Sequence, residues 1–162
     1  MDVIEKWSDF NVAMLGATAA LAGLVIVAAT INITQIVKET ALTSRLASAI
    51  TGLVLAISVC TVGLIPDLTP VVYGAVGATL ALIGAAFAAS TTVRVYQSRH
   101  PENRARPVKA ALAFAPPLVY LVGGVLLLAG APFGLVVFAI GALAAIAAAL
   151  MVSWVVLVEV LR

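Results

Sequence analysis

The chain has 162 residues, of which 64% are apolar and only 10% are charged, and its mean hydropathy is +1.20. Soluble domains are roughly 45–50% apolar and 25% charged, and a sphere of this length cannot hide so much apolar surface from water. The composition therefore excludes a water-soluble domain and predicts an all-α membrane protein.

The rare charged and sulfur-bearing residues exclude several classes of function. Nine Lys and Arg against seven Asp and Glu give a net charge of only +2, which does not favour nucleic-acid binding. One cysteine, Cys60, and one histidine, His100, cannot form an intrachain disulfide or a metal cage. No nucleophile with its base, phosphate loop or HExxH spacing occurs. We therefore expect no enzyme activity, no metal and no cofactor.

Five segments are long enough to cross a membrane, since a helix needs about 20 apolar residues for a hydrocarbon core of about 30 Å. The N-terminal segment MDVIEKWSDF lacks the basic region of a signal peptide, so we expect the first apolar stretch to be a permanent anchor. Thr69 and Pro70 are typical of a helix start, and Gly130 and Pro132 indicate a turn between two helices. The predicted spans are residues 10–37, 46–65, 70–95, 107–129 and 132–161, in a single transmembrane domain over 1–162.

The basic residues predict the orientation of these spans. Eight of the nine flank the first and third loops or, like Arg162, end the chain, and only Lys6 lies on the other side. Because basic residues collect on the cytoplasmic side, we expect an external N-terminus, a cytoplasmic C-terminus and a multi-pass protein of the cell membrane. Trp7, Phe10 and Tyr73 would then lie at the outer membrane interface.

Small residues are expected to pack the helices, because lipid supplies no hydrophobic driving force between them. Glycines recur seven residues apart, on one stripe, in the first, third and fifth predicted helices. The octapeptide GATAALAG at 16–23 also recurs as GATLALIG at 77–84, through either an internal duplication or chance in alanine-rich helices. The predicted packing glycines are Gly16, Gly23, Gly77, Gly84, Gly134 and Gly141.

The first third of the chain also carries a resemblance. The run GATAALAGLVIVAATINI, at 16–33, precedes a second span that ends in a proline turn. It resembles small, mostly uncharacterised actinobacterial integral membrane proteins, which open with a glycine- and alanine-rich helix and a Ser-Ile-Asn-like tail, here Thr30-Ile31-Asn32. The resemblance implies a multi-pass membrane protein and brings no activity or functional residues.

Polar residues near the end of the first span form one candidate site. Thr30, Asn32 and Gln35 cluster there, and Asn32 and Gln35 share a helical face because they are three residues apart. Thr91 lies at the equivalent depth in the third span. These side chains form a hydrogen-bonded contact between helices or the inner mouth of a pore, or they are simply solvated at the interface.

A proline pair in the fourth span forms a second candidate site. Pro116 and Pro117 remove two backbone donors and free the carbonyls of Leu112 and Ala113, and Tyr120 follows one turn later. A broken helix beside a phenol suits a site for a cation or a small solute. The alternative is a structural kink whose carbonyls are satisfied by neighbouring helices.

Glu159 is the charged residue placed deepest in a predicted span, near the cytoplasmic end of the fifth helix. We expect an interfacial ion pair with Arg162, three residues on, or with Arg94. No ionisable residue lies at mid-depth, which argues against a proton-coupled pump.

Together these features predict a non-enzymatic helix-packing module in contact with membrane lipids. It would associate with itself as a homo-oligomer or serve as an accessory subunit of a membrane complex. The alternative is an oligomeric channel or carrier for an ion or small neutral solute, built on Asn32, Gln35, Tyr120 and the kink at Pro116. The direction in which these polar groups face distinguishes the two hypotheses.

Overall fold

The computed structural model describes residues 3–31, 33–38, 40–97 and 106–160, and every regular element in these ranges is helical. Five of the helices are long and apolar enough to cross a membrane, which confirms the predicted all-helical fold and the five candidate spans. In chain order the elements are a short 3-10 helix η1 (Glu5–Trp7), α1 (Ser8–Ile31), α2 (Ile33–Lys38), α3 (Thr40–Val62), α4 (Pro70–Gln97), α5 (Arg106–Leu128) and α6 (Gly134–Val160).

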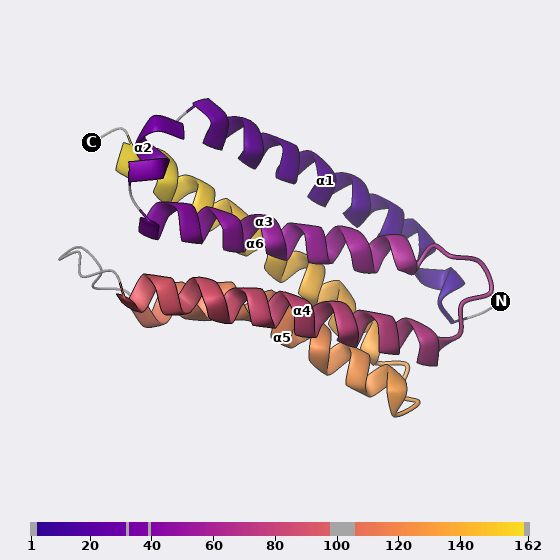
Figure 1. The fold of residues 1–162 in the computed structure, drawn as a ribbon. Coiled ribbons are helices and arrows are strands. Elements are labelled where there is room, and N and C mark those ends of the chain that lie inside the picture. Colours follow the sequence, from indigo (N-terminus) through magenta and orange to yellow (C-terminus); the bar gives the residue numbers. More distant parts are fainter. Residues whose placement is uncertain (1–2, 32, 39, 98–105, 161–162) are drawn as a thin grey trace.

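The helices form three layers (Figure 1). α1 packs on α3 and α6, and these two helices separate it from α4 and α5, which make the most extensive contact in the molecule. The N-terminus, the α3–α4 connection and the α5–α6 turn share one end of the bundle, and the C-terminus lies at the other. The two ends of the chain therefore lie at opposite ends of the bundle.

The first predicted span, over 10–37, is described as two helices, and residue 32 between them lies outside the described residues. α1 ends at Ile31, and α2 folds back against the bundle end, where Ile36 is buried at 2% exposure. Thr30 donates a hydrogen bond to the carbonyl of Ile26 (2.9 Å), a contact that weakens helical continuity. Thr43 donates to the carbonyl of Ile36 (2.8 Å) and so holds the end of α2 against the start of α3.

The second predicted span is displaced toward the N-terminus. α3 begins at Thr40 and ends at Val62, whereas the prediction placed it at 46–65. Thr43 is part of its first turn. The segment TALTS, at 40–44, contains no residue that breaks a helix, so α3 begins earlier than predicted.

The two short turns at the N-terminal end follow the predicted chemistry. The hydroxyl of Thr69 accepts a hydrogen bond from the backbone N–H of Val72 (3.4 Å), and Pro70 is the first residue of α4. Gly130 has a φ of +77° and ends α5 in a Schellman motif, in which the N–H of Ala131 donates to the carbonyl of Leu126 (2.9 Å). Both predicted caps are confirmed.

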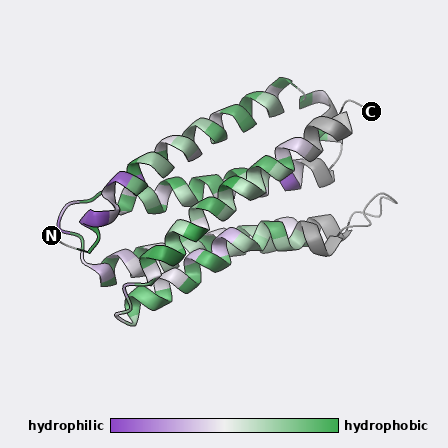
Figure 2. Cartoon of the chain, turned by 180° about the vertical axis from the view of Figure 1, so that it is seen from behind, coloured by the Kyte–Doolittle hydropathy of each residue, from purple (hydrophilic) through white to green (hydrophobic). Residues whose placement is uncertain are grey.

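Apolar side chains cover the outside of the bundle as well as its interior. Figure 2 shows apolar colour along the middle of the helices and strongly hydrophilic residues toward the ends. Large apolar side chains stand exposed on every layer, including Leu24 at 67%, Ile83 at 63% and Trp154 at 70%. Exposed apolar surface on this scale is typical of a protein that contacts membrane lipid.

Glycines bring α4, α5 and α6 into close backbone contact. A Cβ atom added at Gly74 of α4 would lie 2.8 Å from the carbonyl oxygen of Gly124 of α5, and one added at Gly124 would lie 2.8 Å from that of Gly74. On the other side of α5, a Cβ atom at Gly134 would lie 2.6 Å from the carbonyl oxygen of Gly123. These contacts leave no room for a side chain, so the three helices pack through their backbones.

Candidate functional site

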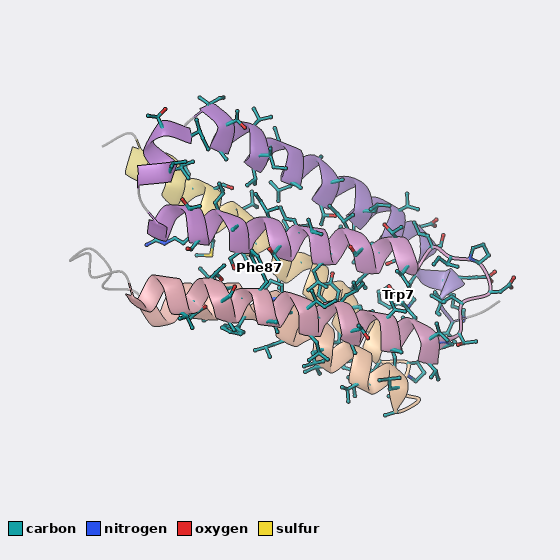
Figure 3. All side chains as sticks on the ribbon, viewed as in Figure 1. Trp7 and Phe87 are labelled. Atoms are coloured by element: carbon teal, nitrogen blue, oxygen red, sulfur yellow. The ribbon has the colours of Figure 1, made fainter. Side chains whose placement is uncertain are left out.

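Every long helix contributes a side chain to one small cavity near the N-terminal end of the bundle. Its volume is about 10 Å³, which is about the size of one water molecule. Figure 3 marks its position by Trp7. The side chains that line it include Trp7 of η1, Asn11 of α1, Cys60 of α3, Tyr73 of α4, Tyr120 of α5 and Phe138 of α6.

Asn11 enters this cavity because Gly63, just after α3, has no side chain. A Cβ atom at Gly63 would lie 2.5 Å from Nδ2 of Asn11 and 2.6 Å from the hydroxyl oxygen of Tyr73. Asn11 is only 5% exposed, and Tyr73 only 2%. The Tyr73 hydroxyl donates a hydrogen bond to the carbonyl of Val59 (3.2 Å). The glycine therefore brings two polar side chains from different helices together inside the bundle.

Tyr120 reaches the same cavity from α5 and is completely buried. A Cβ atom at Gly141 of α6 would lie 3.0–3.1 Å from its ring, so this glycine makes room for the tyrosine. Phe138 packs against both tyrosines, with its ring centroid 5.0 Å from that of Tyr73 and 5.6 Å from that of Tyr120. The aromatic rings fix the positions of both hydroxyl groups.

Two polar groups at this site lack partners in the part of the chain that the structure describes. The hydroxyl of Tyr120 is buried and makes no hydrogen bond, and Nδ2 of Asn11, although close to the Tyr73 hydroxyl, is buried without a hydrogen bond of good geometry. Leaving a buried donor unsatisfied costs about 1–3 kcal/mol. The cavity is thus a place where a small polar molecule would gain hydrogen bonds.

The proline pair lies beside a second cavity of about 10 Å³, between α3, α4 and α5. Figure 3 marks it by Phe87, which is farther from the N-terminal end than Trp7. Pro116 packs on Gly52 of α3, whose added Cβ atom would be 3.6 Å away, and Pro117 packs at the same distance on Gly84 of α4. α5 continues as a helix through both prolines. Tyr120 lines the first cavity, so it does not share a cavity with Pro117 as the predicted site requires.

The structure does not bring Thr30, the described member of the predicted polar cluster, together with Thr91. Thr30 is exposed on α1 and bonds to its own helix, whereas Thr91 is buried on α4 and donates to the carbonyl of Ala88 (2.9 Å). α3 and α6 separate these two helices. Asn32 and the side chain of Gln35 lie outside the described residues.

The predicted ion pair also lies outside the part that the structure describes. This applies to Arg162 and to the side chains of Glu159 and Arg94. The ion pair stays a prediction.

The predicted packing glycines occupy two kinds of environment. Those of α4 and α6 face neighbours, since Gly77 contacts Phe138, and Gly134 contacts α5. In contrast, a Cβ atom added at Gly16 or Gly23 of α1 would meet nothing within 4 Å. The glycines of α1 therefore do not pack within this chain.

Sequence reasoning missed Asn11, Tyr73 and Gly63 as site residues. Tyr73 was expected at the outer interface, but it lies in the core, a correction that follows from its contacts with Val59 and Phe138. The only signal was that Asn11 is a polar residue inside the first turns of an otherwise apolar span. No spacing rule pairs it with a glycine more than fifty residues away.

These features define a class: an all-helical chain with five helices able to span a membrane and a small polar cavity among them. Within the described ranges, no three His, Cys, Asp or Glu side chains gather closely enough to hold a metal ion. No family model, curated protein or solved structure matches this chain. The resemblance of residues 16–33 to actinobacterial membrane proteins stays a prediction.

Proposed function

We propose that this chain is a non-enzymatic, multi-pass membrane module that associates with a second copy of itself through α1. The observation behind the proposal is the α1 stripe, which we define as Gly16, Ala20 and Gly23. All three residues are exposed, and both glycines are open to their surroundings. The stripe is the surface that a partner helix would cover.

The position of the α1 stripe supports this role. At 3.6 residues per turn its three members lie on one line along the helix, opposite the buried residues Thr18 and Val25. α1 is also the least covered long helix, with 17% of its apolar window buried against 33–44% in the other four. Its small residues face away from the bundle, at positions that bulky apolar side chains usually occupy.

A second copy of α1 suits this surface better than lipid does. Small residues four and three positions apart let two helix backbones approach closely, which strengthens dispersion contacts and weak hydrogen bonds. A two-fold symmetric contact needs the same patch on both partners, and the α1 stripe meets this condition with itself. In lipid, the same residues leave a shallow groove that flexible acyl chains fill poorly.

The proposal includes insertion in a cell membrane with the N-terminus outside and the C-terminus in the cytoplasm. Its support is the distribution of basic residues, eight of nine of which belong to one side. In this orientation the cavity lined by Asn11 and Tyr120 lies toward the outer side.

The alternative, a channel or carrier, has less support. It requires polar groups along a shared path, but Thr30 and Thr91 face different surroundings and each cavity has room for about one water molecule. The second alternative, an accessory subunit, places a helix of another protein on the α1 stripe.

The experiment is single-molecule photobleaching of the labelled chain in liposomes over a range of protein-to-lipid ratios. We expect two-step bleaching for the natural sequence and one-step bleaching for the Gly16→Leu, Gly23→Leu double variant. Ala86→Leu on α4 and Ala147→Leu on α6 are matched controls, since both alanines are exposed, and they should leave the two-step fraction unchanged.

One-step bleaching of the natural sequence at every ratio would overturn self-association. Recovery from native membranes with a stoichiometric different protein, lost in the double variant, would support the accessory-subunit alternative instead. Ion or solute flux through monomers in these liposomes would favour a carrier.

A further inference from the structure

We infer that the cavity between Trp7, Asn11, Tyr73 and Tyr120 binds one ordered water molecule, which connects α1 to α4 and α5. This inference is independent of self-association. It concerns how α1 is held in place, and it rests on the chemistry of the cavity lining.

The cavity has the size and the polarity that a buried water requires. Its volume of about 10 Å³ is about one water-sized sphere, and a buried water needs two to four polar partners. Empty cavities in proteins are lined by apolar groups alone. Here the lining includes a carboxamide, two phenols and a thiol, in Asn11, Tyr73, Tyr120 and Cys60.

Two of these groups are donors that need an acceptor. Among the described residues the Tyr120 hydroxyl has no hydrogen-bond partner, and Nδ2 of Asn11, which carries two N–H groups, has none of good geometry, although these side chains are 0% and 5% exposed. A water oxygen has two lone pairs, so one molecule accepts a hydrogen bond from each.

One of the water's own two protons also finds an acceptor in the cavity. Tyr73 gives its hydroxyl proton to the carbonyl of Val59 (3.2 Å), which leaves the lone pairs of the hydroxyl oxygen available. Tyr73 thus accepts, whereas Asn11 and Tyr120 donate. This division of roles fits one water and excludes an apolar occupant.

The water would supply a polar connection that direct packing does not. α1 packs mainly on α3 and α6, while Tyr73 and Tyr120 belong to α4 and α5. Through the water, the first turns of α1 would be joined to the opposite layer of the bundle. Removing it would loosen the N-terminal end of α1 before any other part of the chain.

The sign of the stability change on Tyr120→Phe tests this inference. If the cavity holds water, the variant loses a satisfied hydrogen bond, and the midpoint of thermal unfolding falls by roughly 2–4 °C. If the cavity is dry, the variant removes an unsatisfied hydroxyl and the midpoint rises. Ser153→Ala is the matched control, because the Ser153 hydroxyl is also buried with no partner among the described residues but does not line this cavity; its midpoint should stay or rise.

A second measurement observes the water directly. A structure of the natural sequence in nanodiscs at a resolution that shows waters should reveal a peak within 3.2 Å of both Nδ2 of Asn11 and the hydroxyl oxygen of Tyr120. Asn11→Leu should remove the peak and speed amide exchange in the first turns of α1. Absence of the peak, together with a raised midpoint for Tyr120→Phe, would overturn the inference.

Discussion

The octapeptides at 16–23 and 77–84 match at six of eight positions, yet they bury opposite faces. In α1 the buried residues are Thr18 and Ala22, and both glycines face outward. In α4 both glycines face neighbouring helices, whereas Thr79 and Ile83, the counterparts of Thr18 and Ala22, are exposed. The same small residues serve the interior in one helix and the exterior in the other.

The two positions that differ account for part of this contrast. α4 has Ile83 where α1 has Ala22, and a bulky side chain suits the outer surface better than a tight helix contact. The neighbouring helices account for the rest. α5 presents Gly124 to α4 and Gly123 to α6, whereas α1 packs on α3, which has no such pair of glycines. A local sequence match thus predicts that a helix packs closely, but it does not predict which helix it packs against.

The largest expected effect comes from enlarging one glycine of each octapeptide. In Gly77→Leu the new side chain would overlap the ring of Phe138, and the free energy of unfolding should fall by about 3 kcal/mol or the chain should fail to fold. In Gly16→Leu the side chain enters open space, so the change should stay within about 0.5 kcal/mol.

Unfolding in detergent, at a dilution that keeps the chain monomeric, measures this difference. Equal destabilisation by the two substitutions would show that the glycines of α1 are packed within the chain. The opposite assignment of the two faces would then be wrong.

A smaller effect is expected where α4 and α5 touch through their backbones. In Gly124→Ala the added methyl group would lie 2.8 Å from the carbonyl oxygen of Gly74 and 2.9 Å from Cβ of Ala78. Because the helices must separate to admit it, the free energy of unfolding should fall by about 2 kcal/mol. The neighbouring Val125→Ala, at an exposed position, is the control and should change it far less. A neutral Gly124→Ala would mean that this contact is looser than described.

The smallest effect concerns the turn that orients α5 and α6. Gly130 adopts a φ of +77° with no atom within 4 Å of an added Cβ, so only the backbone strain opposes a side chain there. Gly130→Ala should cost about 1 kcal/mol, and Gly130→Asn less, because asparagine tolerates this conformation better. Equilibrium unfolding of the two variants tests the order, and equal stabilities would remove the argument from backbone strain.

Much of the fold could be predicted from the sequence because lipid-spanning helices obey strong length and composition rules. The caps at Thr69 and Gly130 were also predictable, since each depends on local backbone chemistry alone. The position of α2 against the bundle end was not, because it depends on how Ile36 packs there.

The candidate site was less predictable than the fold. Tyr120 could be selected as a buried polar residue in the middle of a span, but its partner could not, because contacts between distant helices depend on the rotation of each helix about its axis. Asn11 meets Tyr73 only where Gly63 leaves space. That site forms only when three residues from three segments come together, and the spacing of residues within one helix cannot predict such a contact.

Cysteine cross-linking along α1 in native membranes tests the central claim most directly, in a chain whose buried Cys60 is first replaced by alanine. We predict efficient disulfide formation between copies for Gly16→Cys, Ala20→Cys and Gly23→Cys, and much less for Ala17→Cys and Ile26→Cys, which are exposed roughly a quarter turn to either side of the α1 stripe. Equal cross-linking at all five positions, or none at the stripe, would contradict the account.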